Sequence, residues 1–519
     1  MNKHLLKSLP LLLLTLVFGL TVGCSYHDTG YSLGAAEMNQ IPPKGNQGNA
    51  EMSAGEPDGT ADGEEIPDKP QEEASQFWVQ FSTDDSTSMA SAQLYKTGRS
   101  VGGLPHEFVN YYDPPSHLFD EETWGLQSNV TNDIRLGLKA AEGNTVDVFV
   151  EVEEEVDGET HLTGVVQERG TVDLLFQMQA DTVDQSERRA WNLFYCIDVS
   201  GSMGGSNMQF AKRALNNSLA HMKTGDRITL VTFGSNANLI FEDLEFTANE
   251  ATISNAFHSL NAGGGTNMIA GLNLAYELAQ NLHDDNAVNR VILFSDGAAN
   301  VGDTAIASFE SLTRMGDSEG IYLSGVGVGS GYNQERMDRL TDAGKGAHVF
   351  LPSQAEADLI FGDYFSKLVE VSADQVAIEM LLPVGIRLAG FSGEEVSFDP
   401  EQRLQNIVLA AGDDMTFTAR FIVDDEAALN EAATLRVTLR PLSTGEEQIV
   451  ELDVERFADL ISAPGDLFER TQAISDFAKI VTGAGGETQS PADLQDTLNN
   501  MGTSDWGIAE VRSLAQGLN

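Results

Sequence analysis

The stretch that decides the fold is residues 193–205, LFYCIDVSGSMGG, in which an apolar run leads into a loop of serine and glycine. The apolar run is typical of a buried strand. After the loop, one helical face carries the apolar side chains of Met208, Ala211, Leu215, Leu219 and Met222. This part of the chain therefore predicts a strand, a tight loop and a helix, in that order.

The same alternation continues to residue 371. Further apolar runs typical of strands lie at 228–233, 291–294, 321–328 and 348–351. Helical patterns separate them, at about 268–282, 303–314, 333–343 and 354–370. Strands and helices that alternate at this length indicate a parallel, doubly wound sheet with helices on both faces. We therefore expect an α/β domain over 190–371.

The segments on both sides of this domain alternate apolar and polar side chains, as strands of an antiparallel sheet do. Neither 133–188 nor 374–460 is well suited to form a β-sandwich alone. We expect them to form one β-sandwich, with the α/β domain inserted between its halves. Aromatic clusters among polar turns predict a small helical lead-in over 77–132, and apolar side chains at helical spacing predict a helical region over 464–519.

The first 23 residues predict an export signal. Lys3 and Lys7 precede an apolar run, residues 9–20, that is too short to span a bilayer. The segment ends in TVGC, residues 21–24, which resembles the lipobox of bacterial lipoproteins, although Thr21 stands where leucine is usual. We expect lipidation of Cys24 and anchoring to the bacterial cell envelope, with an ordinary cleaved signal peptide as the alternative.

Residues 24–76 are rich in Gly, Glu, Asp, Pro, Asn and Gln, and such a composition cannot bury enough apolar surface to fold. We expect a disordered acidic linker that lifts the folded part away from the membrane. Ser25, directly after the cysteine, is similar to the pattern for sorting to the outer membrane, so the resemblance implies that location.

The charge balance restricts the class of partner. The 519 residues include 79 Asp and Glu against 30 Lys and Arg, which gives a formal net charge of −49. Such a surface repels nucleic acid and anionic lipid headgroups, so we expect neither as a partner, and it attracts divalent cations. Of the two cysteines, Cys196 lies in an apolar run and is expected to be a small buried hydrophobe.

Oxygen-bearing side chains follow the predicted strands of the α/β domain. Asp198, Ser200 and Ser202 come after the first strand, Thr266 closes a glycine-rich loop, and Asp296 follows the strand at 291–294. Ligands of open parallel sheets bind beyond the carboxyl ends of the strands. Three hydroxyls and two carboxylates suit a hard cation, Mg²⁺ or alternatively Mn²⁺ or Ca²⁺, and no His or Cys is nearby in the pattern to indicate zinc.

The motif Asp198-x-Ser200-x-Ser202, with Thr266 and Asp296, resembles the metal-ion-dependent adhesion site of von Willebrand factor type A (VWA) domains. The resemblance implies a Rossmann-like fold, with Ser200 and Ser202 as direct ligands and Thr266 as a ligand directly or through water. It implies that Asp198 and Asp296 act mainly as acceptors behind these ligands. A partner's Asp or Glu carboxylate would then complete the coordination.

The whole chain is similar to bacterial VWA-containing lipoproteins with a β-rich and then helical C-terminal extension. The sequence thus predicts a cell-envelope lipoprotein that binds a protein ligand through a divalent cation, in adhesion or in assembly of an envelope complex. It is not expected to be an enzyme. The alternatives are a metal-dependent hydrolase or phosphatase and a structural envelope protein with a stabilising metal site. Against the hydrolase, position 200 is Ser, so an Asp-x-Asp pair is missing.

Three features have a simpler interpretation. Ser and Asp before a helix are usually caps, but a cap does not need Thr266 and Asp296. The glycines of 325–329 imitate a nucleotide-binding fingerprint, yet no helix starts at the right place, so structural glycines are favoured. His348 is expected to pack in an edge strand rather than to act in catalysis.

Overall fold

The computed structural model describes residues 75–80, 86–97, 99, 101, 105–112, 114, 118, 125–156, 159–329, 331–393, 395–399, 407–483, 489–502 and 504–518. The predicted signal peptide, Cys24 and the predicted linker up to residue 74 lie outside the described residues. Among the helices that are described, none combines the length and the apolar character needed to cross a membrane.

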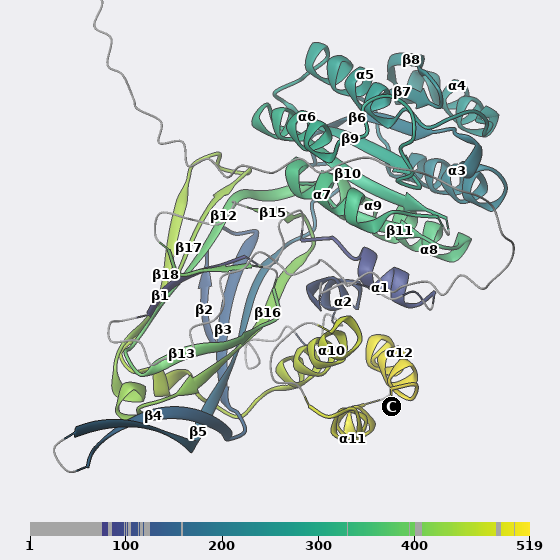
Figure 1. Ribbon diagram of the computed structural model, residues 1–519. Helices are drawn as coiled ribbons and strands as arrows, with labels where there is room; N and C mark the ends of the chain where they lie inside the picture. The colour runs from purple at the N-terminus through teal and green to yellow at the C-terminus, as the bar shows by residue number, and fades with distance from the viewer. Residues whose placement is uncertain are drawn as a thin grey trace, which may run out of the picture. The chain divides into compact units, whose positions relative to one another are not determined.

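Residues 190–371 form an α/β module around one six-stranded sheet, with helices on both faces (Figure 1). The strand order is β11-β10-β9-β6-β7-β8; β8 is antiparallel to β7, and the other neighbours are parallel. The strands are β6 Ala190–Asp198, β7 Arg227–Phe233, β8 Ala237–Glu245, β9 Ala287–Ser295, β10 Ile321–Val328 and β11 His348–Leu351. The predicted α/β fold class is therefore confirmed.

The helices of the module other than α4 follow the predicted patterns. The module's helices are α3 Ser206–Ser218, α4 Phe246–Ser259, α5 Met268–Asn281, α6 Ile306–Ser318, α7 Gln334–Gly344, α8 Gln354–Asp358 and α9 Phe365–Val369. A π-helical turn, Leu359–Asp363, separates the last two. The sequence patterns did not predict β8 and α4. No residue of β8 is fully buried, so this edge strand lacks the apolar run that marks the others.

Two further six-stranded sheets pack against each other. The first sandwich sheet has the order β14-β1-β12-β17-β18, with β15 beside β12; the second has the order β13-β16-β5-β3-β2, with β4 beside β5. Their buried apolar side chains, among them Phe77, Phe176, Phe417 and Val437, form one cluster. The chain passes from β5 into the module and returns from it into β12, so strands from both sides of the module share this core.

The sandwich strands extend beyond the predicted β-rich segments. They are β1 Ser75–Gln80, β2 Leu126–Asn129, β3 Ile134–Glu142, β4 Val146–Val156, β5 Glu159–Ala180, β12 Val371–Leu382, β13 Ile386–Phe391, β14 Glu395–Ser397, β15 Ile407–Ala410, β16 Asp414–Val423, β17 Ala433–Pro441 and β18 Gln448–Val454. The two ends of the lead-in over 77–132, expected to be helical, are thus strands. β1 pairs with β12, about three hundred residues away, and such a short strand is fixed by its partner.

The helices outside the module pack together. They are α1 Ala90–Tyr95, α2 Pro105–Tyr111, α10 Asp466–Thr482, α11 Pro491–Asn500 and α12 Trp506–Ala515. The ring of Phe477 on α10 lies edge-on to Tyr95 and Phe108, with centroids 5.7 and 6.0 Å away. The helical nature of the tail is as predicted, and its apolar face covers the lead-in helices.

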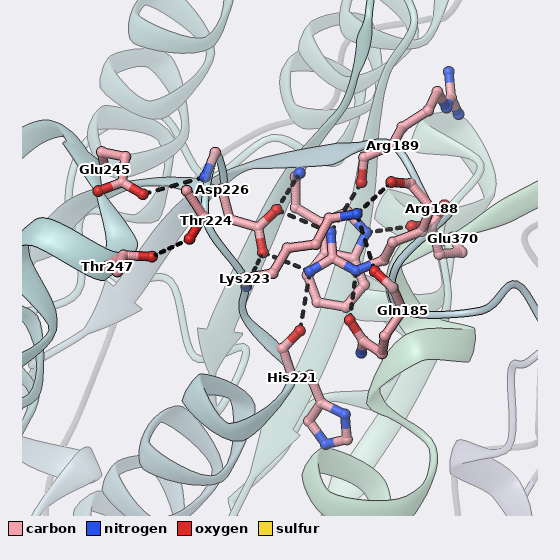
Figure 2. A network of polar contacts seen from close by, with 12 residues as sticks. Gln185, Arg188, Arg189, His221, Lys223, Thr224, Asp226, Glu245, Thr247 and Glu370 are labelled. Carbon is pink, nitrogen blue, oxygen red and sulfur yellow. Dashed lines mark hydrogen bonds and ion pairs between the residues drawn. The ribbon is translucent and has the colours of Figure 1, made fainter.

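A buried ion pair holds the chain where it enters the α/β module (Figure 2). Asp226 accepts hydrogen bonds from the guanidinium of Arg188 at 2.9 and 2.5 Å and from the backbone N–H groups of Trp191 and Lys223 at 2.9 and 2.6 Å. The guanidinium also lies 3.6 Å from the centroid of the Trp191 ring. The Trp191 indole in turn donates to Glu370, directly before β12, so the two chain ends of the module are tied together.

Candidate metal centre

The candidate site lies at the carboxyl end of β6, a central strand with β9 on one side and β7 on the other. The chain runs from β6 to β7 and β8 on one side and then crosses to β9, β10 and β11 on the other, which makes the end of β6 the switch point where parallel sheets bind ligands. Asp198 ends β6 and is fully buried. One carboxylate oxygen accepts the Ser200 backbone N–H at 2.8 Å, and the other accepts the Ser295 hydroxyl at 2.8 Å. Asp198 thus fixes the loop that follows it.

The hydroxyl oxygens of Ser200 and Ser202 lie 3.1 Å apart. Neighbouring ligands of an octahedral Mg²⁺ with bonds of 2.0–2.1 Å are separated by about 3.0 Å, so the spacing fits two adjacent coordination positions. Ser200 is buried, whereas Ser202 is exposed, which leaves one side of the pair open to solvent. Neither the short 3₁₀ helix after Ser200 nor α3 takes a side-chain cap, so the helix-cap interpretation is wrong.

The glycine-rich loop 263–266 is hydrogen-bonded to the serine loop. The Gly263 N–H donates to the Val199 carbonyl at 2.7 Å, and the Gly201 N–H donates to the Gly264 carbonyl at 3.0 Å. Gly264 has a φ of +91°, a conformation that favours glycine. These bonds bring Thr266, which is buried, to the same end of the sheet as Ser200.

Asn300 clamps Thr266 from the other side. Its side-chain oxygen accepts the Thr266 N–H at 2.9 Å, and the N–H groups of Asn300 and Val301 both donate to the Thr266 carbonyl at 3.1 Å. The sequence patterns did not single out Asn300, and they used Ser295 only as part of a strand end. The signal for Ser295 was present, because a hydroxyl at the carboxyl end of β9 lies beside the end of β6.

Asp296 follows β9 and is buried. One of its carboxylate oxygens accepts the Ala298 N–H at 3.1 Å, and its carbonyl accepts the N–H of Asn333, which caps α7. Its negative charge acts on Asp198. The pKa of Asp198 is raised to about 6, first by burial and also by Asp296, while hydrogen bonds from Ser200 and Ser295 oppose the shift.

The donor set fits a hard divalent cation. The structure places Asp198, Ser200 and Ser202 in one hydrogen-bonded unit, with Thr266 on the loop bonded to it and Asp296 on the neighbouring strand end. Two buried carboxylates favour a positive charge at this position, and a bound cation would favour the ionised form of Asp198. Ser200, Ser202 and Thr266 would hold the ion through oxygen.

The fold and the site together define a class of protein domain: an α/β domain with hydroxyl and carboxylate groups at the switch point of its sheet. Comparison with known proteins gives that class its name. Residues 193–298 match the von Willebrand factor type A domain family. The chain carries a VWA domain, as the sequence motif predicted. Domains of this type are commonly protein-interaction or adhesion modules.

Known relatives match between 30% and 38% of the chain. The chain is 31% identical over 196 residues to the uncharacterized protein YfbK of Escherichia coli, covering 37% of this chain and 34% of that protein. It is 25% identical over 201 residues to the uncharacterized protein sll0103 of Synechocystis, covering 38% and 46%. It is 28% identical over 163 residues to human inter-alpha-trypsin inhibitor heavy chain H2, covering 30% and 17%. The match thus spans less than half of each relative.

Solved structures resemble a larger part of the chain at low identity. A von Willebrand factor type A protein from Catenulispora acidiphila has a TM-score of 0.46 and 16% identity, covering 73% of this chain and 84% of that one. The ArnB paralog VWA2 from Sulfolobus acidocaldarius has a TM-score of 0.38 and 14% identity, covering 74% and 98%.

Proposed function

We propose that the chain is an exported, lipid-anchored protein of the bacterial cell envelope. On this proposal its VWA domain binds a protein ligand through Mg²⁺, or Mn²⁺ or Ca²⁺, in adhesion or in the assembly of an envelope complex. The observation that carries the proposal is the 3.1 Å spacing of the Ser200 and Ser202 hydroxyls, on a loop whose Ser200 N–H is bonded to the buried Asp198.

The ligand class follows from the charge of the coordinating groups. Hydroxyl oxygens are neutral, so a divalent ion held by Ser200, Ser202 and Thr266 keeps most of its charge toward the open side. Asp198 and Asp296 are buried behind the loops and already accept hydrogen bonds from them. A carboxylate from an Asp or Glu of the partner would satisfy the ion. On this proposal the ion recruits a ligand and activates no nucleophile.

Magnesium titration of the purified full chain tests the site. We expect calorimetry to detect one Mg²⁺ ion in the wild-type protein, and Asp198→Ala and Ser200→Ala each to weaken binding at least tenfold, because each loses an oxygen that holds or orients the ion. Asp285→Ala is the matched control, since its side chain is 98% exposed and it precedes β9, at the opposite end of that strand from Asp296. Equal Mg²⁺ affinity in all four proteins would contradict the proposal.

Partner capture tests the interaction. Pulldown from envelope extract should recover a protein in Mg²⁺ but not in chelator, and Ser200→Ala should lose it while circular dichroism shows an intact fold. If the variant retains the same partner without metal, the ion has a structural role. Turnover of generic phosphate or ester substrates that depends on Asp198 would instead favour the hydrolase alternative.

The lipid anchor needs a separate test, because it rests on the sequence alone. We expect labelled palmitate fed to expressing cells to be incorporated into the wild-type protein and not into Cys24→Ala. Membrane fractionation should then place the wild type in the outer membrane and release the variant as a soluble exported protein. Equal labelling of both proteins would rule out lipidation at Cys24.

A further inference from the structure

A second group of potential metal ligands lies at the opposite edge of the sheet from β8. Glu107 of α2, Asp338 of α7 and His348 of β11 each offer one ligand atom, and these atoms lie within 4.8 Å of one another. The His348 Nδ1 is 3.3 Å from a carboxylate oxygen of Asp338 and 3.7 Å from one of Glu107. Glu107 and His348 are buried, while the Asp338 side chain is 22% exposed and gives a route from solvent.

We propose that Glu107, Asp338 and His348 form a second cation site, specific for a zinc-like transition metal. In a tetrahedral site with bonds of 2.0–2.1 Å to nitrogen and oxygen, neighbouring ligand atoms lie about 3.3 Å apart. The distance from the His348 Nδ1 to Asp338, 3.3 Å, equals this value, and the distance to Glu107, 3.7 Å, is somewhat longer. An imidazole ligand also favours Zn²⁺ over Mg²⁺ or Ca²⁺, which prefer oxygen alone. The fourth position would hold water.

The other nitrogen of His348 has the partner that a metal-binding imidazole needs. The Nε2 lies in hydrogen-bond contact with the Tyr332 hydroxyl, a pairing that orients the ring with Nδ1 toward the two carboxylates. With a neutral imidazole, the three groups carry two negative charges, which a divalent ion balances. Burying such charge without compensation is costly.

A bound ion would join the lead-in helices to the VWA domain. α1 and the residue before it already cover the edge strand β11: the Met89 N–H donates to the His348 carbonyl at 2.9 Å, and Gln93 of α1 accepts the Phe350 N–H at 2.6 Å. The site adds one ligand from α2 and two from the domain. It shares no residue with the proposed Mg²⁺ site, so either can fail without the other.

Zinc binding of the full chain in detergent tests this inference. The protein is stripped of metal and returned to excess Mg²⁺, which fills hard-cation sites on the acidic surface, and Zn²⁺ is then titrated against a chromophoric chelator. We expect one Zn²⁺ per chain in the wild type and in Asp198→Ala. His348→Gln and Asp338→Asn should each weaken binding at least tenfold. His283→Gln, a partly exposed histidine that faces Asp285, is the matched control.

Cobalt provides an independent readout. Co²⁺ bound at the site should show the strong visible absorption of a tetrahedral ion, and Asp338→Asn should lose this absorption. If His348→Gln does not fold, the Asp338→Asn variant tests the metal site by itself. Unchanged zinc affinity in both variants would overturn the inference. So would the absence of Zn²⁺ binding to the wild-type chain.

Discussion

The most informative single change is Asp226→Asn, which removes a charge from the buried ion pair without changing the side chain's size. One oxygen of Asp226 accepts from Arg188 and from the Trp191 N–H, and the other accepts from Arg188 and from the Lys223 N–H. An amide has one oxygen, so in either orientation its NH₂ group faces two donors. Both side chains of the ion pair are no more than 1% exposed, so water cannot compensate.

The expected loss is about 3 kcal/mol in the free energy of unfolding, at the lower end of the range of about 3–5 kcal/mol for breaking a buried pair. The lower end applies because Arg188 keeps bonds to the carbonyls of Arg189 and His221 and its contact with Trp191. Urea denaturation followed by circular dichroism should show the midpoint of the VWA domain's transition lowered by about 1–2 M. Hydrogen exchange should accelerate in β6 and β7.

The chain supplies a matched control for this change. Asp243 also makes a bidentate pair, through the Nε and one terminal nitrogen of Arg227, but the side chains are 31% and 42% exposed. Asp243→Asn should therefore cost less than about 1 kcal/mol. A loss below about 1 kcal/mol in Asp226→Asn, or equal losses in the two variants, would refute the argument that burial makes this pair important.

Three more predictions concern the site and the packing behind it. Mg²⁺ affinity should fall about tenfold between pH 7.5 and pH 5 by calorimetry, because the raised pKa of Asp198, about 6, lets protons compete with the ion below that pH, and a flat profile would contradict this role. Asn300→Ala should weaken Mg²⁺ binding several-fold with little change in melting temperature, since it frees the loop of Thr266; unaltered binding would show that the clamp is unimportant. Gly327→Ala should lower stability by about 1–3 kcal/mol in thermal denaturation, because its Cβ would lie 2.3 Å from the Tyr332 ring; a neutral result would mean that the ring moves away easily.

The sequence predicts the parts of this fold in which a residue's role follows from its place in a regular element. The buried strands β6 and β9 have apolar runs, and polar residues at their carboxyl ends, Asp198 and Asp296, must come close in a parallel sheet. The glycines of β10 are structural, as predicted, because a side chain at Gly325 or Gly327 would overlap Met337 or Tyr332.

The remaining features depend on contacts between distant segments. β8 has no buried residue, and β1 acquires its structure from pairing with β12 and β14. The clamp on Thr266 depends on the conformation of the loop that carries Asn300. The cluster at His348 combines residues of α2, α7 and β11, and no local sequence pattern connects α2 with the other two elements. The periodicity of apolar residues in the sequence carries no information about such contacts between distant segments.

The joined ends of the VWA domain have a mechanical consequence. The chain enters at β6 and leaves before β12, and the Trp191–Glu370 hydrogen bond holds these two points together. A force applied to the loops at the carboxyl end of the sheet acts along β6. It is transmitted to the sandwich through both covalent connections, the one before β6 and the one before β12. Tension is therefore divided between them, and the parallel strands must shear as a group rather than peel apart one bond at a time.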